Sequence, residues 1–171
     1  MKQKLILAVM TLLLTIGLSS AAAHADTISF TLTNPTQLIN GGAGGTLTYD
    51  VTATAPLTNG ATVNLNSDSF NVSPPLTLDD TDFFADAPFF LNPGDSDTFD
   101  LFTITVPAGT TPGDYTGSFT ILGGATGASN DVIGTVDFTT VVTPEPSSFI
   151  LLGTGLAGAF ATLKRKRFGK I

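Results

Sequence analysis

The sequence lacks cysteine and tryptophan, and it has a single histidine, His24. All seven of its lysines and arginines lie before residue 5 or after residue 163. Residues 26–143 therefore contain 13 aspartates and no glutamate, lysine, arginine or histidine, which is a net charge of −13. The missing cysteine excludes any disulfide, and a surface of this sign repels nucleic acid and anionic lipid. We expect neither as a partner of this segment.

The same absences limit the chemistry of residues 26–143. Histidine, cysteine and lysine supply most enzymatic bases and nucleophiles, and a serine here has no base to activate it. A pair of carboxylates can hydrolyse a glycan, but the aspartates fall mostly in predicted loops. Tyr49 and Tyr115 share the apolar phase of their strands, so neither offers an exposed aromatic platform for a glycan. We expect a protein that is not an enzyme.

The N-terminal end has the pattern of a secretory signal peptide, residues 1–25. Lys2 and Lys4 form a basic start, and an apolar stretch follows from Leu5 to Leu18. Ala23 and Ala25 flank His24 in the small-residue pattern of a signal cleavage site. We predict cleavage after Ala25, which makes residues 26–143 the folded domain.

The C-terminal end, residues 144–171, has three parts in a fixed order. Pro144, Glu145 and Pro146 form a stiff, extended tripeptide, because each proline fixes its own backbone and restricts the residue before it. A transmembrane helix is predicted over about residues 147–163, whose uncharged run from Phe149 is short for a bilayer core of roughly 30 Å. A basic stop-transfer tail follows and marks the cytoplasmic side: Lys164, Arg165, Lys166 and Arg167.

These three parts resemble the PEP-CTERM sorting signal of exported bacterial proteins. The resemblance rests on the Pro144-Glu145-Pro146 motif, the glycine-rich apolar run and the basic tail, and only residues 168–171 extend beyond that pattern. It implies an inner-membrane-anchored intermediate and processing by an exosortase-type transpeptidase. It also implies delivery to the cell surface or extracellular matrix of an exopolysaccharide-producing cell. An ordinary membrane anchor that is never cut is the alternative.

The apolar run also contains a G-x-G-x-x-G pattern at Gly153, Gly155 and Gly158. This pattern binds dinucleotides only between a strand and a helix of a βαβ unit. No such unit surrounds it here, so we interpret the glycines as positions where helices can approach closely in lipid.

The segment between the two ends reads as short strands separated by turns. Apolar residues alternate with threonine and other polar residues, and glycine, proline, asparagine and aspartate interrupt the strands. The phase of the alternation changes at Leu101-Phe102, which predicts a β-bulge. Residues 79–93 are the least regular part, and we expect their four phenylalanines to close one end of the core. The pattern predicts an all-β, antiparallel sandwich of about seven to nine strands.

Residues 91–115 resemble bacterial immunoglobulin-like modules. The similarity lies in a Pro-Gly turn at residues 93–94, an apolar strand from Phe99 to Val106, and a loop that leads to Tyr115. It implies an immunoglobulin-like sandwich in which Tyr115 opens the penultimate strand, where tyrosine-corner residues lie. A fold of this kind implies no chemistry by itself.

The aspartates gather in two clusters that suggest calcium, which prefers carboxylate and carbonyl oxygens. The first cluster is Asp79, Asp80, Asp82 and Asp86, and the second is Asp95, Asp97 and Asp100. Neither has the spacing of an EF-hand loop. A solvated acidic loop that keeps the protein soluble is the alternative interpretation. The sequence predicts a structural or adhesive protein linked to exopolysaccharide, or alternatively a Ca²⁺-dependent module that binds glycan or protein.

Overall fold

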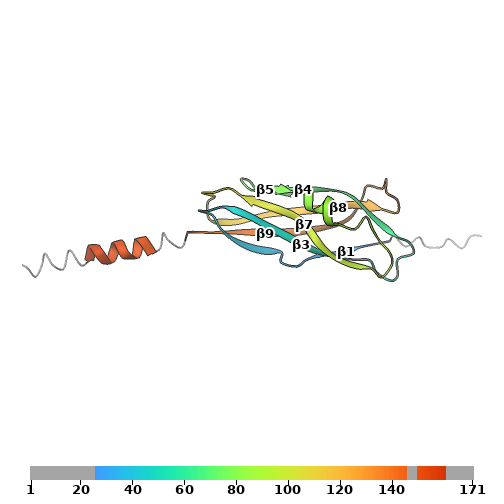
Figure 1. Ribbon diagram of the computed structural model, residues 1–171, viewed down its shortest axis with the longest axis horizontal. Coiled ribbons are helices and arrows are strands. Elements are labelled where there is room, and N and C mark those ends of the chain that lie inside the picture. Colours follow the sequence, from blue (N-terminus) through green and yellow to red (C-terminus); the bar gives the residue numbers. More distant parts are fainter. Residues whose placement is uncertain (1–25, 146–149, 161–171) are drawn as a thin grey trace, which may run out of the picture.

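The computed structural model describes residues 26–145 and 150–160. Residues 26–145 form two β-sheets packed face to face, with strands that run along the long axis of the molecule (Figure 1). The prediction of an all-β sandwich is confirmed. Its strands are β1 (Ser29–Leu32), β2 (Thr36–Asn40), β3 (Gly45–Thr54), β4 (Val63–Val72), β5 (Thr77–Asp79), β6 (Phe90–Leu91), β7 (Ser96–Val106), β8 (Gly113–Gly124) and β9 (Asp131–Thr143).

Sheet A has the strand order β1-β3-β7-β5, and sheet B has the order β2-β9-β8-β4-β6. Every pairing is antiparallel except that of β2 with β9, which is parallel and corrects the prediction of a fully antiparallel sandwich. The chain changes sheets at Pro35. Thr33 N–H still donates to Asp50 O in sheet A, whereas Pro35 O accepts from Thr139 N–H in sheet B. Proline has no N–H for the sheet A ladder, and its fixed backbone suits the crossing.

The core between the sheets is built around Phe102 of β7, which is fully buried. Its ring centroid lies 5.0 Å from that of Tyr49, 5.1 Å from that of Phe119 and 4.7 Å from that of Phe138. Tyr49 and Phe102 come from sheet A, while Phe119 and Phe138 come from sheet B. Offset and tilted ring pairs of this kind stabilise a core beyond the area that they bury.

The predicted β-bulge is confirmed in β7. Tyr49 pairs with Phe102 and Asp50 pairs with Asp100, so Leu101 is the extra residue on its strand. Leu101 and Phe102 are both fully buried although they are consecutive. The extra residue therefore lets two neighbouring apolar side chains enter the core, which regular alternation would forbid.

The structure corrects the prediction for residues 79–93. These residues include a short helix, α2 (Thr81–Asp86), which the sequence pattern does not predict. Only Phe83 enters the core, with 3% of its surface exposed, whereas Phe84, Phe89 and Phe90 are 58%, 83% and 51% exposed. A helix of six residues has one inward position here, and Phe83 occupies it. The other three phenylalanines lie at the surface.

Residues 150–160 form a helix whose side chains are all exposed. This helix lies outside the sandwich, beyond the end at which β9 finishes (Figure 1). Within residues 26–145 and 150–160, no helix is both long enough and apolar enough to cross a membrane. The predicted span of about 147–163 extends past this helix into residues that the structure does not describe.

Candidate functional site

The predicted sorting segment follows the last strand without a spacer. Thr143 ends β9 and pairs with Asn40 of β2, and Pro144 is the next residue. Thr143 O accepts a hydrogen bond from Gly41 N–H at 3.1 Å, and its hydroxyl donates to Ile39 O at 3.2 Å. The sheet therefore holds the chain up to the first residue of the motif.

Glu145 lies against the turn between β2 and β3. A Cβ added at Gly42 would overlap the carboxyl group of Glu145, so the Glu145 side chain occupies space that is free only because residue 42 is glycine. Both Pro144 and Glu145 are exposed. The remaining predicted processing residues lie outside the described part of the chain: Ala23, Ala25, Pro146 and the basic tail Lys164, Arg165, Lys166 and Arg167.

The structure does not bring the predicted calcium ligands together. Within the described residues, no three acidic, histidine or cysteine side chains are close enough to hold one metal ion. Two of the predicted ligands, Asp82 and Asp95, instead accept hydrogen bonds from hydroxyl and amide groups of the protein. Thr103 Oγ1 donates to Asp82 at 2.8 Å, and the amide nitrogens of Asn92 donate to Asp95 at 2.9 Å. The remaining predicted ligands are Asp79, Asp80, Asp86, Asp97 and Asp100.

Two of these aspartates have perturbed acidity. Hydrogen bonds from the side chain and backbone of Thr81 lower the pKa of Asp79, because they favour its ionised form. The pKa of Asp100 is raised, first by desolvation and then by Asp50, which is its register partner across β3 and β7. Asp50 and Asp100 thus form a carboxylate pair on the outer face of sheet A, with Asp82 of α2 adding to the repulsion.

Sequence reasoning missed Asp68 of β4, which lies on the inner face of sheet B. It pairs with Ile121, and Phe70, two residues later, pairs with Phe119. Its Oδ2 is buried and has no hydrogen-bond partner. Desolvation and the charge of Asp80 raise the pKa of Asp68 to about 6, although its own backbone N–H opposes the shift. The sequence did contain an indication of this inward position, because Asp68, Phe70 and Val72 are two residues apart and therefore share one face of the strand.

The outer face of sheet A is a ladder of hydroxyl pairs between β3 and β7. Thr48 pairs with Thr103 at 3.2 Å, Thr52 with Thr98 at 2.8 Å, and Thr54 with Ser96 at 2.8 Å between hydroxyl oxygens. Each hydroxyl can donate once and accept twice, so capacity remains for an external ligand. This face therefore presents hydrogen-bond donors and acceptors in pairs that span the neighbouring strands β3 and β7.

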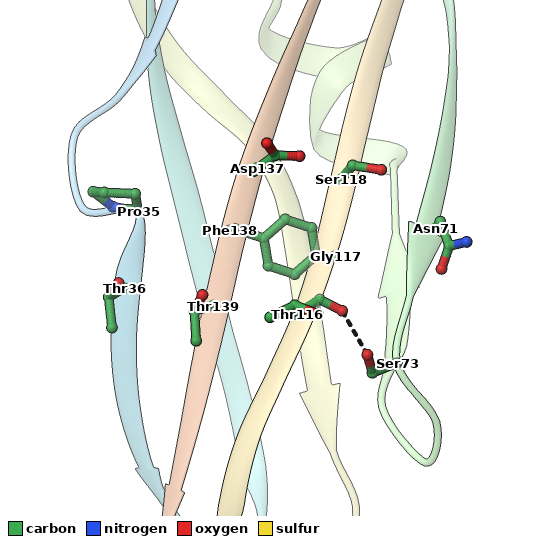
Figure 2. A pocket seen from close by; sticks show the side chains of 10 residues that line it. All are labelled: Pro35, Thr36, Asn71, Ser73, Thr116, Gly117, Ser118, Asp137, Phe138 and Thr139. Atoms are coloured by element: carbon green, nitrogen blue, oxygen red, sulfur yellow. Dashed lines mark hydrogen bonds between the residues drawn. The ribbon is translucent and has the colours of Figure 1, made fainter.

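Sheet B carries a shallow depression of about 490 Å³ on its outer side. Figure 2 shows hydroxyl, amide and carboxylate groups from β2, β4, β8 and β9 around it, and the Ser73 hydroxyl donates to Thr116 O at 2.8 Å. Asp137 is the only titratable group in the lining. This arrangement can accept and donate hydrogen bonds. Its other lining residues are Pro35, Thr36, Asn71, Gly117, Ser118, Phe138 and Thr139.

Comparison with protein families matches residues 142–166 to the PEP-CTERM protein-sorting motif. The matched range includes the Pro144-Glu145-Pro146 tripeptide and most of the basic tail. This motif indicates an exported protein that is sorted by an exosortase and passes through a membrane-anchored intermediate. No curated protein matches the sequence.

The solved structures that this chain matches share little sequence with it. WR4, an MSP family member of Caenorhabditis elegans, has 11% identity and a TM-score of 0.39, covering 67% of this chain and 97% of its own. SSP-19, an MSP-domain-like protein of the same organism, has 17% identity and a TM-score of 0.39, with coverages of 66% and 98%. The secreted serine protease VesC of Vibrio cholerae has 15% identity and a TM-score of 0.43, with coverages of 72% and 25%.

Proposed function

We propose that this chain is a non-catalytic β-sandwich protein of the cell surface or extracellular matrix, with a structural or adhesive role on exopolysaccharide. The hydroxyl ladder of sheet A is the observation that carries the adhesive part. Its threonine and serine pairs present donors and acceptors that match the hydroxyl groups of a polysaccharide chain. An acidic domain with no cationic side chain between residues 26 and 143 also stays hydrated in such a matrix.

We assign the sandwich to the immunoglobulin-like class from its strand order and one tyrosine. The order β1-β3-β7-β5 corresponds to the A-B-E-D sheet of immunoglobulin domains, and β9-β8-β4 corresponds to G-F-C. Tyr115 lies near the start of the penultimate strand, and its hydroxyl donates to Thr111 O at 2.9 Å. That backward hydrogen bond is the feature of a tyrosine corner. The β2–β9 pairing adds a parallel edge to this arrangement.

The sorting part of the proposal is tested by the intact mass of the protein from its native host. We expect loss of residues 1–25 and of the segment that follows the Pro-Glu-Pro motif. Replacing Pro144, Glu145 and Pro146 together by alanine should leave the C-terminal segment attached. A native protein that keeps both ends would contradict this part.

The adhesive part is tested by co-sedimentation with purified matrix polysaccharide. Thr52→Val together with Thr98→Val removes one hydroxyl pair of sheet A, and we expect weaker binding. Thr120→Val together with Thr135→Val removes a pair at 3.0 Å from sheet B and serves as the matched control. Absence of wild-type binding, or equal loss in both variants, would contradict a polysaccharide role for sheet A.

A further inference from the structure

One edge of sheet B is open along most of β4. The short strand β6 pairs with Val63 and Asn64 only, and among the described residues the rest of β4 has a strand partner on the β8 side alone. Figure 2 shows β4 at the margin of the sheet. Ser73 N–H donates to Thr116 O of β8. Because backbone N–H groups alternate in direction along a strand, those of Phe70 and Val72 point toward the open edge.

A small apolar notch lies where this open edge begins. It has a volume of about 80 Å³ and is lined by Leu65, Asn66, Phe83, Phe84, Ala87 and Phe89. Phe84 and Phe89 are 58% and 83% exposed, and Phe84 rests edge-on against the buried Phe83 at 5.1 Å between centroids. Exposed aromatic side chains gathered around a hollow are typical of interaction sites. This hollow has room for one small apolar side chain.

Acidic groups that lack a cationic partner stand beside the same edge. Asp68 lies on β4 with a buried Oδ2 that accepts no hydrogen bond, and the charge of Asp80, just before α2, acts on it. No lysine, arginine or histidine occurs between residues 26 and 143, so the domain itself has no cation to offer. Asp68 and Asp80 are both half-buried, so a cation from another molecule that approaches the accessible part of their side chains would offset the repulsion between the two carboxylates.

We propose that the open edge of β4 binds an extended peptide segment of another protein, in which basic residues accompany apolar ones. The segment adds as a strand beside residues 67–72 and receives hydrogen bonds from the N–H groups of Phe70 and Val72. One apolar side chain enters the notch between Phe84 and Phe89, and a lysine or arginine reaches Asp68 and Asp80. This combination of main-chain pairing, a side-chain pocket and charge is the pattern of strand addition to a sheet edge. It is independent of the sorting function and of polysaccharide binding.

A basic segment fits this edge better than a second copy of the domain does. Two copies each bring a net charge of −13 from residues 26–143, and their aspartates at this edge would face each other. Like charges opposed across an interface are unfavourable and slow the encounter. Opposite charges steer the segment toward the edge and fix its register.

The probe is a short peptide that alternates arginine with valine or phenylalanine, titrated against the full chain in detergent. Phe84→Ser with Phe89→Ser, and separately Asp68→Asn, should each weaken binding by about tenfold. Leu38→Ser removes a 66% exposed apolar side chain from β2, at the opposite edge of the same sheet, and should leave affinity unchanged. A peptide with glutamate in place of arginine should not bind, and added salt should weaken the arginine peptide.

Amide hydrogen exchange distinguishes strand addition from simple surface adsorption. The amides of Phe70 and Val72 should gain protection when the peptide binds, and a proline-interrupted peptide of the same composition should give none. The proposal is overturned if the arginine peptide does not bind, if the glutamate peptide binds as well, or if these amides stay unprotected. It is also overturned if the protein alone dimerises and protects the same amides.

Discussion

The hydroxyl oxygen of Tyr49 lies 3.0 Å from that of Thr140, and this contact joins the two sheets in the middle of the core. Both residues are fully buried. Tyr49 also donates to Thr139 O at 3.0 Å, and because a phenol has one proton, the Thr140 hydroxyl donates to Tyr49. Burial raises the pKa of Tyr49, while the Thr140 hydroxyl opposes this shift. A polar link inside an apolar core fixes how the sheets are aligned.

Tyr49→Phe removes this link and leaves the Thr140 hydroxyl without its tyrosine partner. A buried polar group without its partner costs about 1–3 kcal/mol, so we expect a loss of stability in that range from chemical denaturation. Thr48→Val removes one member of an exposed hydroxyl pair, Thr48 and Thr103, and should change stability by less than about 0.5 kcal/mol. Equal effects of the two substitutions would contradict the importance of the buried link.

Gly117→Ala tests how closely Phe138 packs across β8. A Cβ at residue 117 would overlap the Phe138 ring and lie 2.6 Å from Asn71 O. Overpacking of this kind costs about 1–3 kcal/mol, which should lower the melting temperature by several degrees. Gly113→Ala lies on the same strand, where an added Cβ meets nothing within 4 Å, and should be nearly neutral. A neutral Gly117→Ala would show that the ring can move aside.

Asp68 should make stability fall as pH rises from about 4 to about 6. Its pKa is about 6 in the folded protein, against an ordinary value of 3.8, so in this window the folded state holds a proton that the unfolded state releases. The stabilisation that the protonated Asp68 side chain supplies is fully present when the pH is below its pKa in the unfolded chain. It is lost as the pH rises above its pKa in the folded protein. Asp68→Asn should therefore stabilise the protein at pH 7.5 by about 1 kcal/mol, after allowance for solvent screening, and flatten the pH profile.

The control for Asp68→Asn is Asp114→Asn, which removes an equal charge from an exposed position on β8. It corrects for the general relief of repulsion in a domain with 13 aspartates. Urea titrations at pH 4, 5, 6 and 7.5 give both profiles. Parallel profiles for wild type and Asp68→Asn would show that another group governs the pH dependence.

Calcium should not stabilise the protein beyond the effect of a general divalent cation. The predicted ligands do not converge, and donors such as Thr103 occupy the carboxylate of Asp82. At physiological salt, millimolar Ca²⁺, Mg²⁺ and a chelator should give melting temperatures within about 1 °C of each other. A site with ligand at 100 times its dissociation constant would add about 2.7 kcal/mol. A shift specific to Ca²⁺ would revive the Ca²⁺-dependent binding module.

Local sequence patterns predicted the parts of the fold that local physics dictates. Alternation placed β3, β7, β8 and β9 because one face of each strand is apolar. The change of phase at Leu101-Phe102 predicted the bulge, because two adjacent apolar residues cannot both face inward without it. The order of the Pro144-Glu145-Pro146 motif, apolar run and basic tail identified the sorting signal, since such signals are linear.

Other features depend on contacts between distant residues. β2 has only five residues, none of which is fully buried, and its parallel pairing with β9 joins segments about 100 residues apart. The exposure of Phe84, Phe89 and Phe90 follows from where α2 and β6 lie, which hydrophobicity alone does not reveal. The acidic clusters look alike in sequence, yet their carboxylates do not converge on one point.

The sequence by itself determined the C-terminal sorting motif, the all-β class, the bulge and the absence of any cation from residues 26–143. Each of these depends on composition or on residues close together in the chain. Only the tertiary structure decided that Asp68 lies beneath the edge of sheet B, that β4 keeps an open edge beside an aromatic notch, and that Tyr49 reaches Thr140. These features depend on how the two sheets pack, and packing brings together residues whose separation along the chain carries no signal.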